Sequence, residues 1–78
     1  MRVHLWGELG FYDRERRHRF EVALPGPLPL ADVLRLLGVP EPEVAIAGLN
    51  GEVVRLGDPS VTVEDADRLD LFPPSAGG

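Results

Sequence analysis

The side chains of this sequence offer few groups for covalent chemistry. The chain contains no cysteine, which excludes a thiolate zinc site, a cysteine-ligated iron–sulfur cluster and any mechanism that carries sulfur on a side-chain thiol. Without cysteine, the two histidines, His4 and His18, do not complete a soft metal site, and we expect no bound metal. Ser60 and Ser75 lack a set of residues that would activate a nucleophile.

The carboxylate of Gly78, the last residue of the sequence, is the group with the clearest chemistry. The three residues before it, Ser75-Ala76-Gly77, are all small, so such a tail can enter a narrow channel in a partner. Pro73-Pro74 fixes two φ angles and donates no hydrogen bond, which predicts that it ends a strand and directs the tail away from the body. We expect Gly78 to react and the tail to be recognised through Pro73, Pro74, Ser75, Ala76 and Gly77.

Carboxylates gather near the end of the chain, at Glu64, Asp65, Asp67 and Asp70. Paired acid–base catalysis would need a pocket that a chain of 78 residues can hardly form. Their arrangement is typical of a solvated turn and sheet face, where they would provide electrostatic complementarity to a basic partner.

Length and composition indicate one small globular domain, with 44% hydrophobic and 27% charged residues. The net charge of −5 disfavours nucleic-acid binding, and the densest run of arginines, residues 14–19, is interrupted by Glu15 and His18. No stretch is long and apolar enough for a membrane span and no basic-then-apolar leader is present, so we expect a cytoplasmic location. We assign residues 1–74 to the domain and residues 75–78 to a flexible tail.

Periodicity predicts the elements that position this tail. Apolar side chains recur at every second position in residues 1–6 and 19–24, which predicts two antiparallel strands joined by a connection over residues 7–17. The proline-rich stretch at residues 25–29 then ends the sheet. Apolar residues at positions 30, 33, 34 and 37 predict a short helix, which Gly38 and Pro40 terminate.

Three further strands are predicted at residues 44–49, 52–56 and 68–72. The first two are joined by Asn50-Gly51, a strong signal for a hairpin with a type I′ turn. The order is strand, strand, helix, strand, strand, strand, and the right-handed crossover preference places a later strand parallel to the first. We therefore predict an α+β, β-grasp fold with one short helix on a mixed four- to five-stranded sheet.

The last strand also predicts a surface beside the tail. By alternation, its leucines face the core, while Asp70 and Phe72 face the open side of the sheet. If the first and last strands pair in parallel, Trp6 and His4 lie close to Phe72, and the four residues form a partner interface. The alternative is that Trp6 packs beneath the connection at residues 7–17 as part of a satellite core.

The tail sequence LFPPSAGG at residues 71–78 resembles the C-terminal motif of the MoaD/ThiS family of ubiquitin-like sulfur carriers. The resemblance is closest to the MoaD branch, the small subunit of molybdopterin synthase. Residues 49–52 are similar to the Asn-containing hairpin of the family, residues 65–68 to its acidic turn and residues 30–39 to its helix. The resemblance covers essentially the whole chain, and the tail is its most specific part.

This resemblance implies a carrier and not an enzyme. A ThiF/MoeB-like activating enzyme would use ATP to adenylate Gly78, and a sulfur donor would convert the adenylate to a thiocarboxylate, with no cofactor bound by the chain itself. Gly77 and Ala76 would line the activating channel, and Phe72 with its neighbours would dock the partner. Molybdopterin is the expected destination of the sulfur, with thiamine thiazole or a tRNA base as others, and a large synthase subunit is a further expected partner.

Two other functions fit the same chain. A ubiquitin-like protein modifier would be joined through Gly78 to amines of other proteins, whereas a β-grasp interaction module would have an inert tail. The first would give an isopeptide with a larger protein, a carrier would give a thiocarboxylate on the free chain, and the inert module needs no free carboxylate on Gly78.

Overall fold

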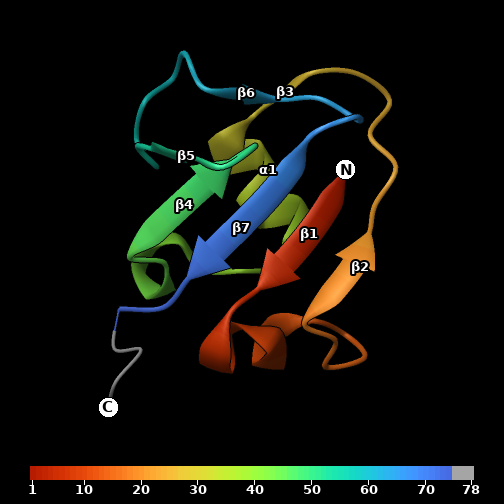
Figure 1. Cartoon of the computed structure of the whole chain (residues 1–78), viewed down its shortest axis with the longest axis vertical. Helices are drawn as coiled ribbons and strands as arrows, with labels where there is room; N and C mark the ends of the chain where they lie inside the picture. Colours follow the sequence, from red (N-terminus) through yellow and green to blue (C-terminus); the bar gives the residue numbers. More distant parts are fainter. Residues whose placement is uncertain (75–78) are drawn as a thin grey trace.

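The computed structural model describes residues 1–74 (Figure 1). Its elements, in chain order, are β1 (Arg2–Leu5), the 3₁₀ helix η1 (Gly7–Tyr12), β2 (Arg19–Glu21), β3 (Leu28–Pro29), α1 (Leu30–Leu37), the 3₁₀ helix η2 (Glu41–Glu43), β4 (Ile46–Leu49), β5 (Glu52–Val54), β6 (Thr62–Val63) and β7 (Arg68–Phe72). The predicted tail at residues 75–78, with Gly78, Gly77, Ala76 and Ser75, lies outside the described residues.

The main sheet has five strands in the order β2-β1-β7-β4-β5. β1 and β7 pair in parallel, with Val3 opposite Leu69, while the β1–β2, β7–β4 and β4–β5 pairs are antiparallel. Figure 1 shows α1 lying behind this sheet, across one of its faces. The predicted α+β, β-grasp class and the parallel pairing of the first and last strands are confirmed.

The core lies between α1 and the sheet, and the leucines of the central strands fill it. Leu5, Leu69 and Leu71 are fully buried, as are Leu30 and Val33 of the helix. The helix ends as predicted, because Gly38 adopts a left-handed conformation, with φ of 75°, that closes the last turn. No helix within residues 1–74 is both long and apolar enough to cross a membrane.

The hairpin between β4 and β5 has the predicted turn. Asn50 and Gly51 have φ values of 52° and 86°, and a type I′ turn needs positive φ at both positions. The Asn50 side chain also ties the turn to the acidic loop, because its Nδ2 donates to Asp67 at 2.9 Å and its Oδ1 accepts from the backbone N–H of Arg68 at 2.8 Å. Asn50 therefore sets the turn and holds the start of β7.

Replacing Asn50 by alanine is expected to lower the free energy of unfolding by about 2–3 kcal/mol, from two lost hydrogen bonds and a left-handed conformation without glycine or asparagine. Asn50→Gly keeps the conformation and loses only the hydrogen bonds, so it should cost less. Urea unfolding of both variants measures the difference. Equal losses would contradict a contribution from the backbone conformation.

Some elements differ from the predictions. The stretch at residues 25–29 does not simply end the sheet, because β3 pairs with β6 in a separate two-stranded sheet, with Leu28 opposite Val63. β2 is shorter than the predicted strand at residues 19–24, since the Leu24 N–H leaves the sheet and donates to Asp65 at 2.8 Å. The predicted connection at residues 7–17 contains η1.

Candidate functional site

The open face of the sheet carries the side chains that were predicted to meet there. Along β7, Leu69 and Leu71 point to the core, and the intervening residues, including Asp70 and Phe72, point to the opposite face and are partly exposed. The register of β1 against β7 places His4 opposite Asp70 on that face. The predicted alternation of β7 is thus confirmed.

His4, Trp6 and Phe72 form an aromatic stack, which we call the aromatic patch. The ring centroids of His4 and Trp6 are 3.9 Å apart, and those of Trp6 and Phe72 are 5.2 Å apart. Trp6 Nε1 donates to Asp70 at 3.0 Å, which fixes the indole on the open face with 39% of its surface exposed. The structure therefore brings all four predicted interface residues together, and the alternative of Trp6 beneath the 7–17 connection is wrong.

Burial in this stack favours the neutral form of His4. Burial lowers its pKa below 6.5, and the charge of Arg19 lowers it further, against the smaller opposing effect of Asp70. Asp70 lies 3.7 Å from Nδ1 of His4, but its carboxylate also accepts from Trp6 and from Arg68. The aromatic patch consequently offers the surfaces of three stacked rings, bordered by the Asp70 carboxylate, to a partner.

The base of the tail is anchored to the body. Pro73 is buried, and Pro74 is the first exposed residue after β7. Pro73 rests against Gly7, whose φ is +55° and where a β-carbon would lie 3.1 Å from Cγ of Pro73. The N–H of Trp6 donates to the carbonyl of Leu71 at 2.9 Å, which continues the β1–β7 pairing up to this contact. The chain therefore leaves the body after Pro73, beside the aromatic patch.

His18 packs against the segment that contacts Pro73. Its Nε2 lies 3.1 Å from the carbonyl oxygen of Gly7, so a proton on Nε2 would be donated to that oxygen. The imidazole covers Gly10 so closely that a β-carbon there would lie 2.7 Å from Nε2. Sequence reasoning did not assign His18 a role. The two glycines Gly7 and Gly10, three residues apart, are the signal that could have indicated that other side chains pack closely against this segment.

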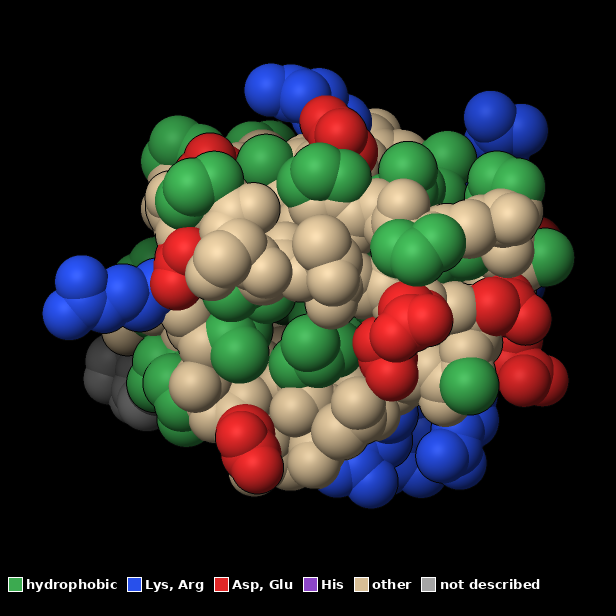
Figure 2. Space-filling view, turned by 90° about the horizontal axis from the view of Figure 1, so that it is seen from above, with side chains coloured by type: hydrophobic (Ala, Val, Ile, Leu, Met, Phe, Trp, Pro, Cys, Tyr) green, Lys and Arg blue, Asp and Glu red, His purple; other side chains and the backbone are tan. Residues whose placement is uncertain are grey.

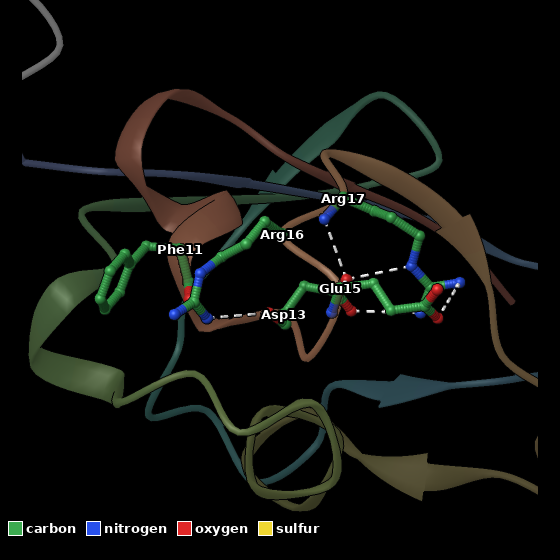
Figure 3. A network of polar contacts seen from close by, with 5 residues as sticks. All are labelled: Phe11, Asp13, Glu15, Arg16 and Arg17. Carbon is green, nitrogen blue, oxygen red and sulfur yellow. Dashed lines mark hydrogen bonds and ion pairs between the residues drawn. The ribbon is translucent and has the colours of Figure 1, made fainter.

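Asp13 organises the loop that carries His18 (Figure 3). Its buried carboxylate accepts from the backbone N–H groups of Glu15 and Arg17, at 3.0 and 2.9 Å, and forms a two-pronged ion pair with the Arg17 side chain. Beside it, Arg16 donates to the Phe11 carbonyl and lies over the Phe11 ring. The arginine-rich segment is thus a folded loop that fixes the position of His18.

The carboxylates of the acidic turn are also used within the fold. Asp65 accepts from the backbone N–H of Leu24, and Asp67 accepts from Asn50 and from the backbone N–H of Glu64. These hydrogen bonds lower the pKa of both carboxyl groups, led by Leu24 for Asp65 and by Asn50 for Asp67. The turn therefore ties the start of β7 to the β4–β5 hairpin and to the segment that follows β2.

The protein is expected to lose stability as the pH falls below about 4, the ordinary pKa of aspartate. Hydrogen bonds lower the pKa of Asp13, Asp65 and Asp67, from the Arg17 side chain first in the case of Asp13. Their stabilisation is complete above that pH and disappears as the pH falls through the lowered values. Urea midpoints at pH 7, 4 and 2.5 measure the loss, which Asp13→Asn should reduce. An unchanged pH dependence in that variant would contradict the assignment.

Comparisons with known proteins point to a single protein family. A family model described as the ThiS family matches residues 11–78. The crystal structure of a thiamine biosynthesis protein (ThiS) from Geobacter metallireducens is 25% identical over 100% of both chains, with a TM-score of 0.61. An NMR structure of a thiamine biosynthesis protein from Geobacter metallireducens is 24% identical and supports the fold, with a TM-score of 0.57 over 100% of this chain and 88% of that chain. No curated protein matches the sequence.

These findings show the family of the chain but do not confirm the predicted branch of that family. The matched family and both solved structures bear the names ThiS or thiamine biosynthesis, so the expected preference for the MoaD branch and for molybdopterin is not confirmed. That preference depended on the short tail motif at residues 71–78, whereas the family model extends over most of the domain. Because it matches residues 11–78, well over half of the sequence, the chain belongs to the ThiS family.

Proposed function

We propose that this protein is a sulfur carrier that acts through the carboxylate of Gly78 in thiamine biosynthesis. The observation that carries the proposal is the ThiS-family match, which runs to residue 78 and so includes Gly77-Gly78. The name of the similar Geobacter metallireducens protein supports thiamine biosynthesis as the pathway. The lack of cysteine agrees with sulfur carried on an acyl group.

The chemistry begins with a carboxylate that has no usable leaving group. An activating enzyme of the ThiF/MoeB type brings ATP, an oxygen of the Gly78 carboxylate attacks the α-phosphorus, and pyrophosphate leaves. A sulfur donor then supplies sulfur at the oxidation level of sulfide, which attacks the carbonyl carbon and expels AMP, so that a carbon–sulfur bond replaces the bond to the AMP oxygen. Glycine suits this sequence because no β-carbon hinders attack at its carbonyl carbon.

The fold fixes the point from which the tail extends. Pro73 is held on Gly7, so the four residues from Ser75 to Gly78 start from a defined point next to the aromatic patch. We infer that Phe72, Trp6, His4 and Asp70 contact the partner while Gly77, Ala76, Ser75 and Pro74 enter its channel. The exposed indole beside the tail exit supports this division of roles, because tryptophan is enriched among residues that dominate interface energetics.

Intact-mass analysis of the untagged protein from its native cells, with and without an alkylating reagent, tests the proposal. A species with one oxygen replaced by sulfur, alkylated at Gly78, is the expected result, since no cysteine can give a thiol adduct. An isopeptide with a larger protein would indicate a modifier instead. If only the plain carboxylate appears after incubation with ATP, the activating enzyme and a sulfur donor, the carrier function is refuted.

A further inference from the structure

The open face of β2, β1 and β7 has a composition unlike the rest of the protein. A hollow of about 770 Å³ lies over these strands. It is lined by the aromatic patch and other apolar side chains, and by the charged residues Arg2, Arg19, Arg68, Glu21 and Asp70. It therefore holds three of the eight basic residues of the chain but only two of its thirteen acidic ones. Elsewhere acidic residues prevail, and Figure 2 shows Asp and Glu side chains spread over the end of the molecule seen from above.

Two of the arginines in the hollow are available for a partner. Arg68 is engaged by Asp70, at 3.3 Å. Arg2 and Arg19 are exposed, and within residues 1–74 neither forms a salt bridge or a side-chain hydrogen bond. Glu21 lies opposite Arg2 on the neighbouring strand and offsets one of these charges. The arginines that line the hollow still outnumber its carboxylates. The hollow is thus locally cationic on a chain whose net charge is −5.

Arg2 lies at one end of this face and Trp6 at the other, while Arg19 is paired with His4 between them. Trp6 lies four residues beyond Arg2, which corresponds to about 13 Å along a strand. At the Trp6 end, the aromatic patch is extended by Ile46, which is paired with Phe72 and is 47% exposed. A single small anion cannot contact both Arg2 and Trp6, and the rings stack on one another instead of leaving a slot for a base. The arrangement fits a protein surface.

We propose that the docking surface for the partner extends beyond the aromatic patch over the hollow, where Arg2 and Arg19 bind carboxylates of that protein. The inference rests on the proposed function, because the partner seated here would receive the tail. Charge complementarity carries it: a partner with an acidic segment is attracted to the hollow and repelled by most of the remaining surface. That contrast orients the partner, so that an apolar pocket of the partner meets the aromatic patch beside the tail exit. The segment of the partner proposed to meet this face is acidic, whereas the carboxylates near the end of the chain were expected to complement a basic partner.

The test compares two double variants that change the net charge equally. Arg2→Ala/Arg19→Ala removes the cations of the hollow, and Arg14→Ala/Arg55→Ala removes two arginines that do not line it. The probe is the purified ThiF/MoeB-like activating enzyme from the same cells. Its ATP–pyrophosphate exchange is measured as a function of the carrier concentration. The first variant should raise the KM for the carrier about tenfold at low salt with kcat unchanged, and 0.5 M NaCl should shrink the effect. The second should change KM less than twofold.

Equal effects of the two double variants would overturn the docking surface, because they would reflect net charge alone. No effect of either would overturn it as well. If the unaltered chain supports no exchange, the proposed function fails, and titration calorimetry of the same enzyme with the three proteins then judges docking separately. Weaker binding only in the Arg2→Ala/Arg19→Ala variant supports the surface, and absence of binding by all three refutes it.

Discussion

Removal of Gly78 is expected to abolish thiocarboxylate formation completely while leaving the fold intact. The shortened chain still ends in a glycine carboxylate, on Gly77, but that carboxylate falls short by about 3.5 Å, the span of one extended residue. A displacement of about 1 Å can already cost 100-fold in rate when reacting groups must be aligned. Intact mass after incubation with ATP, the activating enzyme and a sulfur donor measures the loss.

A matched control for this deletion is Ser75→Ala, which keeps the length of the tail and the small size of its residues. It should retain near-normal thiocarboxylate formation. The described fold ends at Pro74, so the urea midpoints of both variants should equal that of the unaltered protein. Substantial sulfur loading of the chain that lacks Gly78 would show that length is not critical and would contradict the proposed reacting atom.

Truncation of Leu71 to alanine is expected to give the largest loss of stability. Leu71 is fully buried on β7, which lies between β1 and β4 in the middle of the sheet. Such a truncation costs about 2–5 kcal/mol through lost burial and the cavity that remains. Since a domain of this size has a free energy of unfolding of roughly 4–12 kcal/mol, much of the total would be lost. Urea unfolding at pH 7 measures it.

Val53→Thr is the control for this prediction. Val53 lies on the edge strand β5 and is 79% exposed, and threonine keeps the branched shape that suits a strand. We expect a change within about 0.5 kcal/mol, as for ordinary surface substitutions. A loss below about 1 kcal/mol for Leu71→Ala would mean that the core of the sheet repacks around the missing atoms.

Sequence patterns predicted the parts of the fold that depend on strong local signals. The alternation around Leu69 and Leu71 predicted which face of β7 is buried, and the positive φ required at Asn50 and Gly51 predicted the hairpin. The crossover preference predicted a later strand parallel to the first, and the β-grasp arrangement made that strand the last one, which placed Trp6 next to Phe72.

Other features had no such signal. The pairing of Leu28 with Val63 joins two residues far apart in the sequence, and a strand of two residues has no period to detect. The contact of His18 with Gly10 depends on how the loop returns to η1, which is a matter of tertiary packing. The cationic hollow likewise appears only when β2 is placed beside β1, because Arg2 and Arg19 belong to separate segments.

The position of β7 has a mechanical consequence. β7 is bonded along both edges, to β1 in parallel and to β4 antiparallel, and the tail continues directly from it. A pull on Gly78 along the strand would therefore load the hydrogen bonds of both pairings in shear, all at the same time, and would not peel them apart one by one. In the proposed cycle, successive enzymes could draw the reacting end into their channels and release it with the sheet acting as a rigid handle.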